Sequence, residues 1–389
     1  MTRRLGARLS PVGPVLLHWG VPALLDHRPS EGRQIVSLDG LRGVAVLFVL
    51  LSHLSNAGIG VLPFLSFSGI GKVGVWLFFV LSSFLLTSQF LEKSDEQLRQ
   101  PAVWFTYWVR RFLRIYPLFG LVMLVAYLVN DQGIFPPLGA PENLDDLVNR
   151  LTIRDAKGIE WSILVEFRFY FILPLIVIGI VFLLRRKVTF VMLVLLAAVV
   201  LATLYGPPPS LIQLRPYLPI FLLGISAAVV HVKIKQSGME IPHRLRVGAE
   251  ALAITLFVVV VLLTPSIYGF IVGKSVPLNH FHKDLTLFGA LWSAFLLAHL
   301  NGTGHSARVL SAWPLRYLGV ISFGVYLWHP PIIKVVSDIH GMAPPLAALL
   351  VLVIVTSLAT LTYVVVERPF LRMRPRPPNW LPRAKVVKG

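Results

Sequence analysis

Apolar residues gather along this chain into runs of about 18 to 22 positions, separated by charged or Pro/Gly-rich breaks. A helix rises about 1.5 Å per residue, so each run can cross a hydrocarbon core of about 30 Å. The pattern predicts an all-α, polytopic transmembrane bundle of about ten spans. We expect these spans at 36–56, 73–90, 113–129, 161–183, 188–205, 215–232, 249–264, 284–300, 316–336 and 345–366.

Lys and Arg residues are distributed unevenly over the breaks. About 26 of the 36 lie in the N-terminal arm, in the breaks after even-numbered spans and in the C-terminal tail, and about 7 lie in the remaining breaks. Because cytoplasmic loops are enriched in Lys and Arg, both termini are predicted to be cytoplasmic. The chain then divides into a cytoplasmic arm (1–35), a transmembrane domain (36–370) and a basic cytoplasmic tail (371–389).

Composition narrows the classes of protein. Hydrophobic residues make up 56% of the chain and charged residues 14%, which excludes an ordinary soluble enzyme. The net charge of +18 is spread over short clusters between apolar runs, which indicates topology signals and not a nucleic-acid surface. Because there is no cysteine, thiol catalysis, disulfides and cysteine-ligated metals are excluded.

The first span carries two polar residues that need an explanation. In SLDGLRGVAVLFVLLSH (37–53), Arg42 and His53 are eleven residues apart, close to three turns, so they share one face about 16 Å apart. A charge that faces lipid costs several kcal/mol, so this face is expected to point into the bundle and to line a substrate tunnel. The alternative is a structural ion pair of Arg42 with Asp39 and a hydrogen-bonded core histidine.

The fourth span carries polar residues at a depth similar to that of His53. WSILVEFRFYFILP (161–174) contains Trp161, Glu166 and Arg168. Glu166 is expected to hold or charge-compensate the imidazole for general-base catalysis. The alternative is an internal compensation between Glu166 and Arg168, weakened because positions two apart on a helix point in different directions.

The ninth span carries polar residues at the same depth as His53 and Glu166. FGVYLWHPPI (323–332) contains Tyr326, Trp328 and His329, and its two prolines are expected to break or kink the helix. A kinked helix with such side chains is typical of a ligand-binding element, although His329 could also be a packing residue. Lys334 lies near the outer end of this span, where its ammonium can reach the interface.

Arginines mark the cytoplasmic entrance of the third span. WVRRFLRIYP (108–117) puts Arg111 and Arg114 on one helix face, from which they could grip phosphates through bidentate bonds. Membrane topology alone would also place arginines here. Glu367, which follows the tenth span, is the expected internal partner of one of the two. No nucleotide-loop or zinc-protease motif occurs, and no metal site is expected.

The motifs of this chain resemble, in the same order, those of the acyltransferase 3 family of bacterial multi-span membrane acyltransferases. They are LDGLRG with Arg42-x10-His53, GVWLFFVLSSFLL (74–86), Arg111-x-x-Arg114, WSILVEFRFY, YLWHPP and ERPF. Two of these motifs depart from the family's pattern. Ser83 stands where glycine is common, and Phe167 and Arg168 stand where Glu and Gln are frequent.

The resemblance implies transfer of an acyl group, commonly acetyl, from cytosolic acyl-CoA to a hydroxyl of a sugar-containing acceptor, in the bacterial inner membrane. Acyl-CoA is then a co-substrate, and no permanently bound cofactor is expected. The family's essential arginine and histidine correspond to Arg42 and His53. We expect catalytic roles for His53, Glu166 and His329, donor binding by Arg42, Arg111 and Arg114, an acceptor pocket of Trp161, Arg168, Tyr326 and Trp328, and structural ion pairs through Asp39 and Glu367.

A transporter or flippase of a glycan or acylated metabolite is the rival function, because buried charges also mark transport paths. Against it, the sequence shows no inverted repeat. The expected partners are acyl-CoA, a sugar-containing acceptor and membrane lipids, without nucleic acid, and a homodimer is left open. Many members of the family carry an SGNH-type esterase-like domain after the spans. This chain ends in a basic tail, so the membrane domain or a separate protein is expected to complete the transfer.

Overall fold

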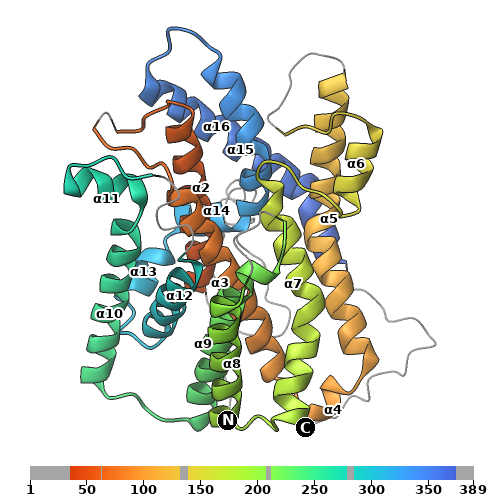
Figure 1. The fold of residues 1–389 in the computed structure, drawn as a ribbon, viewed down its shortest axis with the longest axis vertical. Helices are drawn as coiled ribbons and strands as arrows, with labels where there is room; N and C mark the ends of the chain where they lie inside the picture. Colours follow the sequence, from red (N-terminus) through yellow and green to blue (C-terminus); the bar gives the residue numbers. More distant parts are fainter. Residues whose placement is uncertain (1–35, 63, 132–138, 207–211, 278–283, 374–389) are drawn as a thin grey trace, which may run out of the picture.

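The computed structural model describes residues 36–62, 64–131, 139–206, 212–277 and 284–373, and the expected N-terminal arm and most of the tail lie outside them. The regular elements in these ranges are helices (Figure 1). In chain order they are α2 (Val36–Asn56), α3 (Ile70–Leu91), α4 (Asp95–Leu98), α5 (Pro101–Asp131), α6 (Leu144–Leu151), α7 (Glu160–Ile178), η2 (Gly179–Leu183), α8 (Val188–Leu204), η3 (Arg215–Tyr217), α9 (Leu218–Ser237), α10 (His243–Leu262), α11 (Pro265–Val272), α12 (Leu285–Leu300), α13 (His305–Leu310), α14 (Trp313–Val320), α15 (Ser322–Ser337), α16 (Pro344–Thr362), η4 (Tyr363–Glu367) and α17 (Arg368–Arg372).

Within the described residues, seven helices are long and apolar enough to cross a membrane, and there are eight such spans if the bent pair α14–α15 counts as one. Two shorter apolar helices, α8 and α12, stand where the fifth and eighth spans are expected. The prediction of an all-helical, multi-span membrane protein is confirmed. The count of ten spans and the side on which the termini lie stay predictions.

Helices α2 and α3 form the centre of the bundle. Of their apolar windows 67% and 83% are buried, against 17% for α10 and 28% for each of α5 and α16. Helix α2 packs on α3, α14 and α15, α3 packs on α9, and α16 packs on α15. In Figure 1, α12 and α10 lie on one side of this centre and α5 lies on the other. The peripheral helices turn apolar side chains outward, as expected where lipid is the solvent.

Glycines let α2 lie backbone to backbone against its neighbours. A Cβ at Gly43 would overlap the carbonyl oxygen of Leu315 in α14. In return, a Cβ at Gly319 in α14 would overlap the carbonyl oxygen of Asp39 in α2, and Gly40 has the same relation to α13. Small residues allow such close crossings, which Cα–H···O contacts then stabilise. The LDGLRG motif is therefore a packing motif as well as the carrier of the arginine of this span.

The ninth expected span is bent by 77° between α14 and α15, at Ile321. The prediction of a break at the proline pair was wrong, because Pro330 and Pro331 both lie inside α15, which continues to Ser337. The glycine contacts fix α14 along α2, whereas α15 packs on α16. The chain therefore turns where it passes from one packing partner to the other.

Gly319→Ala is expected to destabilise the bundle by about 1–3 kcal/mol, because a methyl that overlaps a backbone carbonyl cannot be relieved by a side-chain rotation. The thermal midpoint of the protein in detergent measures this. Gly248→Ala in α10 is the matched control, since nothing lies within 4 Å of its added Cβ and alanine favours a helix. Equal midpoints for the two variants would contradict the packing role.

Candidate active site

Arg42 lies in the second turn of α2, partly buried, and its electrostatic neighbours come from three helices. They are Asp39 on α2 itself, Arg114 on α5, and Glu166 and Tyr170 on α7. The structure thus brings together residues that lie in three separate motifs of the sequence. Side chains of α2, α5 and α7 therefore meet at one polar site in the bundle.

Arg114 forms an ion pair with Glu367, with 3.1 Å between Nη1 and Oε2. The side chain of Glu367 is 2% exposed and that of Arg114 is 18% exposed, so water screens the pair little. Glu367 ends the π-helix η4, whose Tyr363 is buried as well. π-Helical turns are frequent at functional sites, and we therefore include η4 in the candidate site.

Arg111 lies over the ring of Tyr170, with 5.8 Å between the guanidinium carbon and the ring centroid. This distance is that of a cation–π contact. Its Nε is buried and has no hydrogen-bond partner among the residues that the structure describes. We call Arg42, Arg111 and Arg114 the arginine cluster. Three guanidinium groups in a partly buried site suit an anionic ligand such as a phosphate.

Glu166 is held by two hydroxyl groups and not by the histidine. Its Oε1 accepts hydrogen bonds from the Tyr170 hydroxyl, at 2.7 Å, and from the Ser82 hydroxyl of α3. In the described part of the chain no hydrogen bond joins Glu166 to His53. The carboxylate belongs with the arginine cluster. Sequence reasoning missed Ser82 and Tyr170, although Tyr170 follows Glu166 by four residues and so lies on the same helix face.

His53 and His329 lie against each other, with ring centroids 4.7 Å apart and planes tilted by 62°. Each Nδ1 is hydrogen-bonded to the carbonyl oxygen one turn earlier, Val49 at 2.8 Å and Val325 at 3.1 Å. A carbonyl only accepts, so both Nδ1 atoms carry the hydrogen, and in the neutral rings each Nε2 keeps a lone pair. The Nε2 of His329 is buried without a partner among the described residues. The pair therefore presents two basic nitrogens.

Tyr326 connects the histidine pair to the start of α7. Its ring is 5.8 Å from that of His329. Its hydroxyl hydrogen-bonds to the Ser162 hydroxyl at 2.7 Å and donates to the Ile159 carbonyl oxygen at 2.8 Å. One hydroxyl thus fixes α15 against α7 next to the histidines, and Ser162 is a third residue that sequence reasoning missed.

The other three residues expected in the acceptor pocket interact with different parts of the structure. Trp161 stacks on Tyr217 at 5.2 Å. Arg168 donates to the carbonyl oxygens of Ile212 and Ile153, which tie α7 to neighbouring segments. Trp328 has a buried Nε1 with no hydrogen-bond partner in the described ranges. Among the described residues no hydrogen bond or ring contact joins these three side chains, so their shared pocket stays a prediction.

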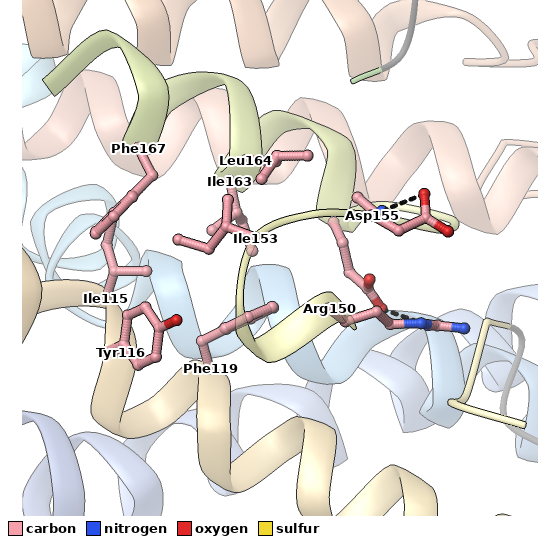
Figure 2. Close-up of a pocket in the computed structure, with 11 residues that line it drawn as sticks. Ile115, Tyr116, Phe119, Arg150, Ile153, Asp155, Ile163, Leu164 and Phe167 are labelled. Carbon is pink, nitrogen blue, oxygen red and sulfur yellow. Dashed lines mark hydrogen bonds and ion pairs between the residues drawn. The ribbon is translucent and has the colours of Figure 1, made fainter. Parts of the chain in front are cut away.

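Residues 139–160 form a polar segment that contains α6. This segment covers one side of α5 and α7 at the upper end of the bundle in Figure 1. Arg150 of α6 is 1% exposed, and its guanidinium binds Asp146 and Glu160, each at 2.8 Å. Behind it, a pocket lies between α5, α6 and α7 (Figure 2). Apolar side chains of α5 and α7 face each other there, and Arg150 closes one end. The pocket wall consists mainly of Ile115, Tyr116, Phe119, Ile153, Ile163, Leu164 and Phe167.

Among the described residues no three His, Asp or Glu side chains gather as metal ligands.

The fold and the polar centre define a helical membrane protein with arginine and histidine groups inside its helix bundle. A family model, Acyl_transf_3, an acyltransferase domain, matches residues 35–364. The chain belongs to this acyltransferase family.

Curated relatives agree with the family. YrhL of Bacillus subtilis (strain 168), named provisionally as a peptidoglycan O-acetyltransferase, is 28% identical over 375 residues, which cover 88% of this chain and 56% of YrhL. The peptidoglycan O-acetyltransferase OatA of Listeria monocytogenes is 25% identical over 346 residues, covering 80% of this chain and 51% of OatA. The O-acetyltransferase OatA of Staphylococcus aureus is 25% identical over 388 residues, covering 91% and 60%. This chain thus spans between about half and three fifths of the length of these relatives. No solved structure shows significant similarity to it.

Asp146→Asn is expected to loosen the segment around α6. Hydrogen bonds from Arg150 hold the pKa of Asp146 well below its usual range. The stabilisation by its carboxylate, about 2 kcal/mol for charge-assisted bonds, is therefore complete above about pH 4 and is lost as the pH falls through the lowered pKa. Hydrogen exchange of residues 139–160 at pH 7 should rise in the variant. In the unchanged protein, exchange relative to the intrinsic rate at each pH should rise only in acid.

Asp145→Asn provides the comparison for this experiment, because Asp145 is exposed on the same helix. Its exchange should follow that of the unchanged protein. Equal exchange in the Asp145 and Asp146 variants at pH 7 would show that the Arg150 network does not hold the segment.

Proposed function

We propose that this chain transfers an acyl group, acetyl in the first instance, from acyl-CoA to a hydroxyl of a sugar-containing acceptor. One observation carries the proposal: α2 bears Arg42 of the arginine cluster and, eleven residues later, His53 with an available Nε2. Family membership supports acyl transfer. The names of the relatives favour a cell-surface glycan such as peptidoglycan as the acceptor.

The donor enters from the cytoplasm in this proposal. Ten spans with both termini in the cytoplasm of a bacterium would put the start of α2 and the arginine cluster toward that side, in agreement with the distribution of Lys and Arg. The cluster binds the phosphates of CoA through charge-assisted hydrogen bonds. The acyl end of the extended donor then points along α2 toward His53.

The reaction needs one base at the histidine pair. Nε2 of His53 takes the proton of the acceptor hydroxyl while the hydroxyl oxygen bonds to the thioester carbonyl carbon. The carbon–sulfur bond then breaks, and the leaving CoA thiolate takes the proton back from His53. The products are an ester of the acceptor and free CoA. A two-step route, with His53 as a transient acyl carrier, would use the same nitrogen.

His329 contacts the acceptor as a hydrogen-bond acceptor. In the tautomer fixed by Val325, its Nε2 has a lone pair and no hydrogen, so stabilisation of an oxyanion would require a protonated ring. Glu166 acts on the donor side, where it fixes Tyr170 beneath Arg111. Tyr326 is a positioning residue that holds α15 and therefore His329.

His53→Gln is expected to lower acyl transfer by at least about 100-fold, because removal of a general base costs that much or more. Membrane vesicles that contain the protein and the host's cell-surface glycans would be given radiolabelled acetyl-CoA, and ester-linked label in the glycans would be counted. Mass spectrometry of the same glycans should show added acetyl groups.

His231→Gln is the control, because His231 is also a partly buried histidine but lies on α9, beside Phe84. It should keep full activity. Unchanged labelling in His53→Gln would refute the proposed mechanism. Glycan movement across the vesicle membrane without acetyl-CoA would favour a transporter instead.

A further inference from the structure

A chain of hydrogen bonds surrounds the first turn of α2. The Ser37 hydroxyl lies 2.9 Å from Nε2 of His299, at the end of α12. Nδ1 of His299 lies 2.9 Å from the Ser306 hydroxyl, in α13. Hydroxyl groups can donate or accept, so this chain holds in either tautomer of the histidine. It joins α2, α12 and α13.

Glu250 of α10 anchors the other end of this chain. Its Oε1 accepts from the Ser306 backbone at 2.6 Å, and its Oε2 accepts from the Gly304 backbone at 2.9 Å and from the Thr303 hydroxyl at 3.1 Å. The carboxylate thereby satisfies free backbone N–H groups at the start of α13. A fourth helix is tied into the same network.

Burial and position show what this network can do. Ser37 and His299 are each 3% exposed and Glu250 is 6% exposed, and the polar groups of all three are engaged in hydrogen bonds within the network. Ser37 precedes Arg42 by five residues, about 7.5 Å along α2. Gly40, three residues after Ser37 and on the same side of α2, lies against the backbone of α13. The network therefore fixes the register and rotation of the helical turns that carry Arg42.

We propose that Ser37, Glu250, His299 and Ser306, which we call the α2 clamp, position Arg42 for the donor. The inference rests on the proposed function, in which Arg42 binds acyl-CoA. These four are positioning residues, because their effect on the donor passes through the orientation of α2. A guanidinium forms bidentate bonds only in a narrow geometry, so a small rotation of α2 weakens the contact with a phosphate.

Ser37→Ala and His299→Ala are expected to raise the Kd for acetyl-CoA at least about fivefold, the effect of one hydrogen bond lost. Binding would be measured by calorimetry on the full chain in lipid nanodiscs, together with the thermal midpoint. His299→Gln should bind more tightly than His299→Ala, because its amide can still reach Ser37. Ser83→Ala is the matched control, since that buried hydroxyl bonds only to carbonyl groups of its own helix.

A double-mutant cycle with Arg42→Ala distinguishes positioning from general support of the fold. If the clamp acts through Arg42, Ser37→Ala should raise the Kd no further in the Arg42→Ala background. Independent, multiplying effects of the two changes would overturn the proposal, as would unchanged binding in both Ser37→Ala and His299→Ala. A failure of the unchanged protein to bind acetyl-CoA would instead refute the donor assignment itself.

Discussion

The close packing of α2 against its neighbours is the constraint on which the polar centre depends. Glycine at positions 40, 43 and 319 lets three backbones come together where any side chain would overlap a carbonyl oxygen. A helix held in this way can neither slide nor rotate without a steric clash. A shift by one residue would turn each side chain by about 100°, so the same contacts fix the directions in which Arg42 and His53 point.

The hydrogen-bond partners of the buried polar groups show which side chains are engaged with the protein itself. A polar group away from water needs a partner, and most of those in this bundle have one. Glu367 has Arg114, Arg150 has two carboxylates, and Glu166 has two hydroxyls. Within the described residues, the buried polar atoms without a hydrogen-bond partner include Nε2 of His329 and Nε of Arg111. These two atoms lie in the two groups to which we assign the acceptor and the donor.

Hydrophobic run length alone located most of the helices, because a bilayer requires about 20 apolar residues per span. The runs at 36–56 and 161–183 agree with helices at Val36–Asn56 and Glu160–Leu183. The eleven-residue spacing also placed Arg42 and His53 on one buried helix. The bend at Ile321 could not be read in this way, because it arises from the packing of α14 and α15 on different partners. The π-helix that turns Glu367 inward leaves no pattern in the sequence.

The hydrogen-bond partners of Glu166 could not be read from the sequence for the same reason. Equal depth in a membrane does not imply contact, since helices at one depth can face different neighbours. Only the tertiary structure shows that Glu166 faces Ser82 of α3.

Arg42 and His53 lie three turns apart on α2, and this separation suits the two different tasks that we propose for them, phosphate binding and proton transfer. Binding of phosphates needs permanent positive charge, which guanidinium groups supply at any physiological pH. Proton transfer needs a neutral imidazole with a free nitrogen, and a carboxylate beside it would favour the charged ring. The structure keeps Glu166 with the arginines and pairs Nδ1 of each histidine with a backbone carbonyl oxygen. Three helical turns therefore separate a charged environment from a neutral one, and a long, flexible donor such as acyl-CoA can reach both.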